Sequence, residues 1–251
     1  RYAEFDGLNL TWETLEGVPK HNGPLAGSPL GGSDAVVPPV IAAYDARCPL
    51  DLDRWPGPEA QVAALADDIA YTNHDIDDGV RAGLFALDEL ADAPPVGEAL
   101  TAVDRDYPAL AGGRRIHEVT RRVIDAMVND LLAESRRRMD AADPGAPRAA
   151  PVIAFSEPMG ENIAALRGFL FQRMYRHYRV NRMTSKARRL VGELFRLYLA
   201  EPSCLPAEWQ AAADGPGAAR TARVVADYIA GMTDRYAIEQ HRKLFDPYDK
   251  A

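Results

Sequence analysis

Helical patterning dominates this sequence and constrains its fold more than any other feature. Apolar residues recur at helical spacing over long segments, which short breaks rich in glycine and proline separate. The best candidate for a strand, residues 36–41, contains two prolines, and proline interrupts the hydrogen-bonding ladder of a sheet. The sequence therefore predicts an all-α protein. The expected helices cover residues 9–20, 59–84, 88–92, 115–139, 157–176, 182–200, 206–212, 217–231 and 234–244.

The composition argues against several classes of protein. Of the 251 residues, 47% are apolar and 26% are charged, whereas a disordered protein has too few apolar residues to fold. No apolar run reaches the roughly 18 residues that a transmembrane helix needs. The two cysteines, Cys48 and Cys204, are too few for a disulfide framework or a cysteine-rich zinc site, which favours the reducing cytoplasm. The net charge of −8 argues against generic binding to nucleic acid.

The segment 59–84 carries the strongest functional signal. At about 100° per residue, its apolar and polar side chains separate onto opposite sides of a helix. Asp67, Tyr71 and Asp75 are spaced i, i+4, i+8, so their side chains form one stripe, which we call the Asp67 stripe. His74 and Asp78 fall on the same polar side, and the apolar side contains Val62, Leu65, Ile69, Ile76, Val80 and Leu84.

Two interpretations of this polar side remain open. Most acidic faces of helices are simply exposed to solvent. Against that interpretation, acidic residues close together on one face repel each other unless a cation or a ligand compensates. The polar side also contains two aromatic rings, those of Tyr71 and His74. Asn73 lies on the apolar side, where a helix that packs on a core usually has an apolar residue. Carboxylates suit Mg²⁺ or Mn²⁺, and one carboxylate with imidazoles suits Mn, Fe, Ni or Zn.

Four stretches of the chain carry a family resemblance. They are residues 66–78 (ADDIAYTNHDIDD), residues 9–24 (NLTWETLEGVPKHNGP), residues 174–177 (MYRH) and residues 227–237 (DYIAGMTDRYA). In this order they resemble the bacterial deoxyguanosinetriphosphate triphosphohydrolase-like proteins of the HD superfamily, over residues 5–246. The resemblance implies an HD-domain-like helical bundle with additional C-terminal helices. Residues 1–92 would be the C-terminal portion of the HD domain and residues 93–251 a helical C-terminal region.

The resemblance also implies roles for the stripe. In this family a first histidine, a His-Asp doublet and a distant final aspartate hold a divalent metal ion, and the final aspartate corresponds to Asp67. The next residue, Asp68, lies about 100° further round the helix and is the weaker candidate for a ligand. By position, Tyr71 would pack on the deoxyribose and Asp75 would accept a hydrogen bond from its 3′-hydroxyl.

The implied reaction is metal-dependent hydrolysis of a deoxynucleoside triphosphate (dNTP) to the deoxynucleoside and inorganic tripolyphosphate. A water or hydroxide on Mg²⁺ or Mn²⁺, or alternatively on Ni²⁺, Zn²⁺ or Fe²⁺, would attack the α-phosphorus. The first histidine and the His-Asp doublet are not in this sequence; its one adjacent pair, His74-Asp75, belongs to the final motif. We therefore expect the chain to be the C-terminal two-thirds of the enzyme and to be inactive alone.

A basic segment, residues 161–200, contains nine lysines and arginines but two acids, Glu161 and Glu193. One interpretation is a phosphate-binding wall for a substrate or an effector nucleotide, with Arg176, Arg179 and Lys186 as the candidates. The alternative is a solvated helix surface or a subunit interface.

Two other functions stay in consideration. The chain could be a nucleotide-binding regulatory protein of the HD family without turnover, or the basic segment could bind single-stranded nucleic acid. The resemblance further implies a homo-oligomer that binds a dNTP substrate. The composition leads us to expect a cytoplasmic protein that is not in a membrane.

Overall fold

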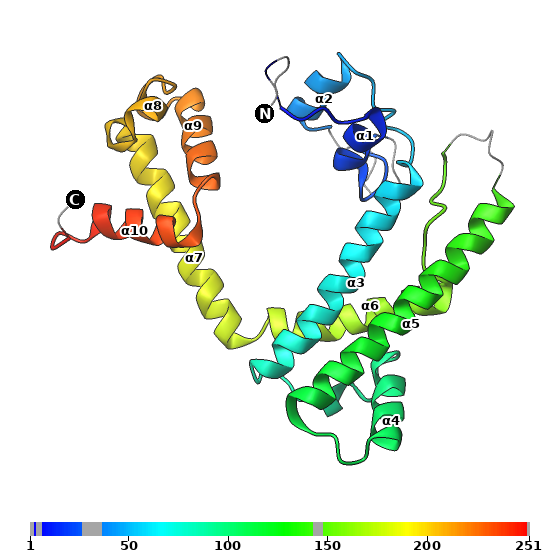
Figure 1. Cartoon of the computed structure of the whole chain (residues 1–251). Helices are drawn as coiled ribbons and strands as arrows, with labels where there is room; N and C mark the ends of the chain where they lie inside the picture. The colour runs from blue at the N-terminus through cyan, green and yellow to red at the C-terminus, as the bar shows by residue number, and fades with distance from the viewer. Residues whose placement is uncertain (1–2, 4–6, 27–36, 143–147, 250–251) are drawn as a thin grey trace. The chain divides into compact units, whose positions relative to one another are not determined.

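A computed structural model of the chain describes residues 3, 7–26, 37–142 and 148–249, and within these residues every regular element is a helix (Figure 1). The predicted all-α class is therefore confirmed. The chain divides into two compact units, Arg1–Met174 and Tyr175–Ala251, called the first and second unit below.

The first unit is built around four helices, α3 to α6, that share one core. Its α-helices are α1 (Trp12–Lys20), α2 (Pro39–Asp45), α3 (Pro58–Arg81), α4 (Val96–Asp106), α5 (Gly112–Ala141) and α6 (Glu157–Leu170). Helices α3 and α4 both pack against the long helix α5, and α6 packs against α3 (Figure 1). The core residues come from all four of these helices, among them Ile69, Ile76, Val96, Leu100, Val103, Val119, Met127, Ile163, Leu166 and Leu170.

The second unit has its own, smaller core. It contains α7 (Tyr178–Ala200), α8 (Ala207–Gln210), α9 (Ala219–Ala230) and α10 (Asp234–Phe245), and α9 and α10 both pack against α7. The core consists of Leu194, Tyr198, Leu205, Val225 and Tyr228. The predicted domain boundary at 92/93 does not coincide with the division at 174/175, because α4 and α5 share the core of α3. Whether residues 1–92 belong to an HD domain stays a prediction.

Helix α2 is not among the helices that the sequence predicts, and two further stretches differ from them. Helix α4 lies in a region where Pro94, Pro95 and Gly97 indicate breaks; the helix begins directly after the prolines, a position where proline is tolerated. The single helix expected over 157–176 ends at Leu170 and continues as a π-turn, Phe171–Tyr175. Helix α7 then begins at Tyr178, earlier than the predicted residue 182.

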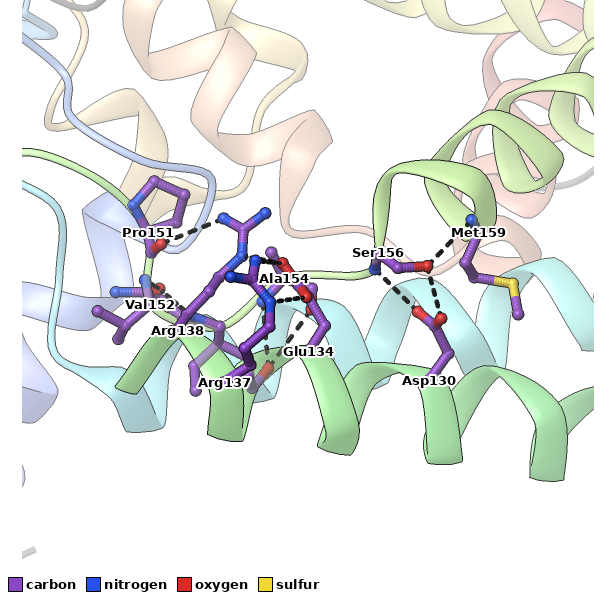
Figure 2. Close-up of polar contacts among 12 residues, drawn as sticks. Asp130, Glu134, Arg137, Arg138, Pro151, Val152, Ala154, Ser156 and Met159 are labelled. Carbon is purple, nitrogen blue, oxygen red and sulfur yellow. Dashed lines mark hydrogen bonds and ion pairs between the residues drawn. The ribbon is translucent and has the colours of Figure 1, made fainter. Parts of the chain in front are cut away.

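An extended strap, residues 148–156, crosses from α5 back to α6 and is held by polar side chains (Figure 2). Ser156 donates from its backbone N–H and its hydroxyl to the carboxylate of Asp130 on α5, at 2.9 and 2.6 Å. The Ser156 hydroxyl also caps α6 by accepting from the Met159 N–H. Gln61 of α3 accepts from the N–H groups of Val152 and Ile153, both at 3.1 Å. The backbone N–H groups of Val152, Ile153 and Ser156 are thus all hydrogen-bonded, although the segment is irregular.

Helix α1 is fixed against the first unit by a close backbone approach and a buried ion pair. A Cβ atom added at Gly17 would lie 2.8 Å from the Cβ of Ala60 on α3, so glycine permits this contact. One helical turn apart on α1, Glu16 and Lys20 are both fully buried and joined at 2.6 Å. Arg148 of the strap donates to the same Glu16 carboxylate at 2.8 Å, which ties α1 to a residue far along the chain.

Candidate functional site

Helix α3, which carries the Asp67 stripe, forms for local reasons that the sequence makes clear. Pro58 occupies its first turn, where the missing N–H costs nothing. Glu59 lies in the first turn and Arg81 in the last, the ends where an anion and a cation respectively stabilise the helix dipole. The helix runs unbroken for 24 residues, so the i, i+4, i+8 spacing of the stripe holds in the structure.

The three residues of the stripe differ in exposure. Asp67 is exposed and Tyr71 retains 57% of its accessible surface, whereas Asp75 retains 9% and is buried. A face that simply meets solvent would leave all three exposed. A buried carboxylate requires polar partners, so this side of α3 is not a plain solvated face at Asp75.

The opposite side of α3 is the core side, as the sequence predicts, with one exception. Ile69 and Ile76 are buried, and Asn73 among them retains 1% of its surface. The Asn73 amide donates to the Ile69 carbonyl at 2.8 Å and contacts the Met127 sulfur at 3.3 Å. The prediction for Val62 is wrong, because its side chain is 46% exposed. Helix α1 covers Ala60, and Val62 lies about 200° further round α3, so α1 does not cover Val62.

A groove between α1 and α3 extends the face of the stripe. Its volume is about 870 Å³, within the range of ordinary small-molecule pockets. Ala63 lines it and precedes Asp67 by one helical turn, so the groove and the aspartate lie on the same face of α3. The other lining residues are Thr11, Glu13, Thr14, Gly17, Val18, His21, Gly57, Glu59 and Ala60.

An ion pair lies beside the stripe that the sequence did not predict. Asp68 on α3 and Arg167 on α6 are joined at 2.9 Å, with side chains 46% and 48% exposed. Arg167 belongs to the basic segment, but only the packing of α6 on α3 reveals which of the segment's cations lies here.

The expected metal ligand, Asp67, is part of no larger group of possible ligands within the described residues. Among the residues that the structure describes, no group of three or more histidines, cysteines or acids could hold a metal ion. The carboxylate of Asp67 is exposed. The part of the chain described here thus does not form a complete metal site.

The three basic candidates belong to the second unit, or to the turn that opens it. Arg176 lies between the π-turn and α7, and its carbonyl accepts from the Asn181 amide at 2.9 Å. Arg179 is in the first turn of α7 with its guanidinium 5.9 Å from the centre of the Tyr178 ring, and Lys186 is exposed. The structure does not test whether they bind phosphate.

The search for membrane-spanning segments covered the described residues. None of the helices there is both long enough and apolar enough to cross a bilayer.

Comparison with known proteins gives a consistent result. Residues 153–243 match the model of the phosphohydrolase-associated domain family. A protein of Parvibaculum lavamentivorans named deoxyguanosinetriphosphate triphosphohydrolase-like protein is 55% identical over 99% of the chain. Proteins of the same name from Azorhizobium caulinodans and Caulobacter sp. (strain K31) are 53% and 54% identical over 98% of it. The chain spans 62–64% of the length of these relatives.

Proposed function

The chain is homologous to the deoxyguanosinetriphosphate triphosphohydrolase-like proteins along almost its whole length, and we propose that its protein hydrolyses dNTPs to deoxynucleosides and inorganic tripolyphosphate. The observation that carries this proposal is the face of α3, where Asp67, Tyr71 and the buried Asp75 follow the groove between α1 and α3.

Two residues of the face would select the sugar. The exposed ring of Tyr71 could pack flat on a deoxyribose, and a ring in that place would leave no room for a 2′-hydroxyl. The carboxylate of Asp75, one turn further, would accept a hydrogen bond from the 3′-hydroxyl. A sugar that lacks this hydroxyl would lose the hydrogen bond to Asp75, and we expect the site to bind it less well.

Asp67 would contribute one carboxylate ligand to a divalent metal ion, Mg²⁺ or Mn²⁺ by its oxygen chemistry. The further ligands would come from residues that this chain does not contain. The protein expressed from its complete reading frame is therefore the right material for every assay of activity.

The test is to incubate that protein with each dNTP and each ribonucleotide, with Mg²⁺, with Mn²⁺ and with EDTA, and to separate the products by anion exchange. We expect equal amounts of deoxynucleoside and tripolyphosphate. Release of orthophosphate or pyrophosphate would contradict the proposal. Tight dNTP binding without any product, in every metal and with a second dNTP present as effector, would favour a regulatory nucleotide-binding protein instead.

Tyr71 allows a second test of the same site. Replacing it with alanine should reduce the preference for dNTPs over ribonucleotides, whereas Tyr71→Phe keeps the ring and should preserve it. Equal selectivity in both variants would remove Tyr71 from the sugar site. The proposal also includes a homo-oligomer in the cytoplasm, which sedimentation and cell fractionation would test.

A further inference from the structure

We propose that two copies of this chain associate through helix α5, an inference that rests on the proposed function because it names the contact surface of the proposed homo-oligomer. Helix α5 presents four apolar side chains to solvent, although it packs on α3 and α4. They are Ile124, Val128, Leu132 and Met139, and between 36% and 47% of each is exposed. We call these four residues the α5 seam.

The seam is a continuous stripe along one side of the helix. At about 100° per residue, its four members fall within an arc of about 80° and extend about 22 Å along the helix axis. The buried residues of α5, among them Val119, Val123 and Met127, point to another side, into the core of the first unit. Single exposed apolar residues are ordinary, whereas an aligned row of them is typical of a surface that packs on a partner.

Two opposite charges lie beside the seam and indicate what the partner is. Asp125 and Arg136 are both exposed, and they flank the seam on the same side, within about 20° of each other round the helix. Because about 16 Å of helix axis separates them, they cannot pair with each other within one chain. A second copy of α5 offers each of them an opposite charge.

Antiparallel pairing of two α5 helices brings these charges together. With Val128 of one copy opposite Leu132 of the other, Asp125 of one copy comes within one residue of the level of Arg136 of the other. In an antiparallel pair related by a two-fold axis, the same flank of each helix faces its counterpart, so the ion pair forms twice. In a parallel pair this flank would face the opposite flank of the other copy, and the two charges would not meet.

Helix α5 is held rigidly enough to present this surface. Its core side is buried against α3 and α4, and Asp130 of α5 binds Ser156 of the strap (Figure 2). Association therefore orders few additional groups, and little of the free energy gained by burying the seam is lost as conformational entropy. The seam needs no rearrangement of the first unit to become accessible.

The experiment measures self-association by sedimentation velocity over a series of concentrations, in the protein from the complete reading frame. Leu132→Lys places a charge in the seam and should weaken association about ten-fold or more, because that charge would be buried without a partner. The matched control is Ile238→Lys, at an aliphatic residue of α10 that is 59% exposed, and it should associate as the wild type does. Circular dichroism confirms that each variant folds.

Exchanging the two charges tests the antiparallel register. Asp125→Arg or Arg136→Asp alone puts like charges opposite each other, twice in each dimer, and should weaken association about ten-fold. The double variant restores opposite charges across the contact and should associate within about three-fold of the wild type. Because the two residues are too far apart to interact within one helix, only a contact between copies explains such a recovery.

Three outcomes overturn the inference: a protein that stays monomeric at every concentration, a Leu132→Lys variant that associates like Ile238→Lys, or a double variant as weak as either single one. Sedimentation needs no turnover, so a monomer that hydrolyses dNTPs would overturn this inference and leave the proposed reaction standing. A dimer that responds to the variants as expected but hydrolyses no dNTP would support the inference and count against the proposed reaction.

Discussion

The ammonium of Lys20 lies 2.6 Å from the carboxylate of Glu16, and both side chains are fully buried. Lys20 also donates to the Asp51 carbonyl at 2.8 Å. Burial alone raises the pKa of Glu16, but hydrogen bonds from Arg148 and Lys20 outweigh it and hold the pKa below its ordinary value. This network fixes α1, which forms one wall of the groove.

Replacing Glu16 with glutamine should destabilise the first unit by about 3 kcal/mol, because Lys20 would be left buried without a counter-ion. Glu13→Gln on the exposed side of the same helix is the control and should change stability by less than about 0.5 kcal/mol. Urea unfolding of both variants measures the difference. Equal stabilities would show that the buried pair contributes nothing.

Two glycines within helices should respond oppositely to alanine. A Cβ at Gly79 would lie 2.3 Å from the buried ring of Phe85, so Gly79→Ala should cost about 1–3 kcal/mol. Gly160 on α6 has open space, and Gly160→Ala should stabilise by about 0.5–1 kcal/mol. Thermal unfolding of the two variants shows whether each substitution raises or lowers stability. A Gly79→Ala variant more stable than the wild type would contradict the packing of Phe85 against Gly79.

Gln61 holds the strap to α3 through two hydrogen bonds and makes a third to the residue that precedes Gly57. Its side chain accepts from Val152 and Ile153 and donates to the Pro56 carbonyl at 2.8 Å. Gln61→Ala should lower stability by about 2 kcal/mol, since these backbone groups would lose their partner. Hydrogen exchange should speed up at the Val152 and Ile153 amides. Unchanged exchange at both amides would contradict this role, and Gln172→Ala, at an exposed position, is the control.

Acid sensitivity should arise in part from Glu134. Hydrogen bonds from Arg137 and Arg138 lower the pKa of Glu134 in the folded protein to about 2 (Figure 2). A lowered folded pKa contributes stability above the ordinary pKa near 4.5, and this contribution is lost as the pH falls towards 2. Glu134→Gln should therefore lose less stability than the wild type between pH 5 and pH 3, in urea unfolding at each pH. An identical pH profile would rule out this contribution, and Glu161→Gln is the control.

Periodicity predicted the elements better than it predicted their contacts. The spacing of Asp67, Tyr71 and Asp75 was sufficient to place them on one face of α3, and the burial of Asn73 follows from the same pattern. The burial of Asp75 could not be predicted, because it depends on what packs against α3. Helix α4 was missed because Pro94 and Pro95 indicate a break, although Val96, Leu100 and Val103 are buried at helical spacing directly after them.

The contacts that shape the candidate site join distant parts of the chain. Glu16 and Arg148 are 132 residues apart, and Arg167 meets Asp68 only through the packing of α6 on α3. A local pattern could show that Arg167 belongs to a basic segment. It could not show that this arginine, and not another of the segment, lies beside the stripe.

The most direct test of the proposed function compares two adjacent aspartates in the protein from the complete reading frame. The measurement is the rate of tripolyphosphate release from dGTP with Mg²⁺ or Mn²⁺, in Asp67→Asn and Asp68→Asn. We predict that Asp67→Asn lowers the rate by roughly 100-fold or more, as loss of a metal ligand should, whereas Asp68→Asn keeps most of it. Wild-type rates in Asp67→Asn, or equal losses in both variants, would contradict the account.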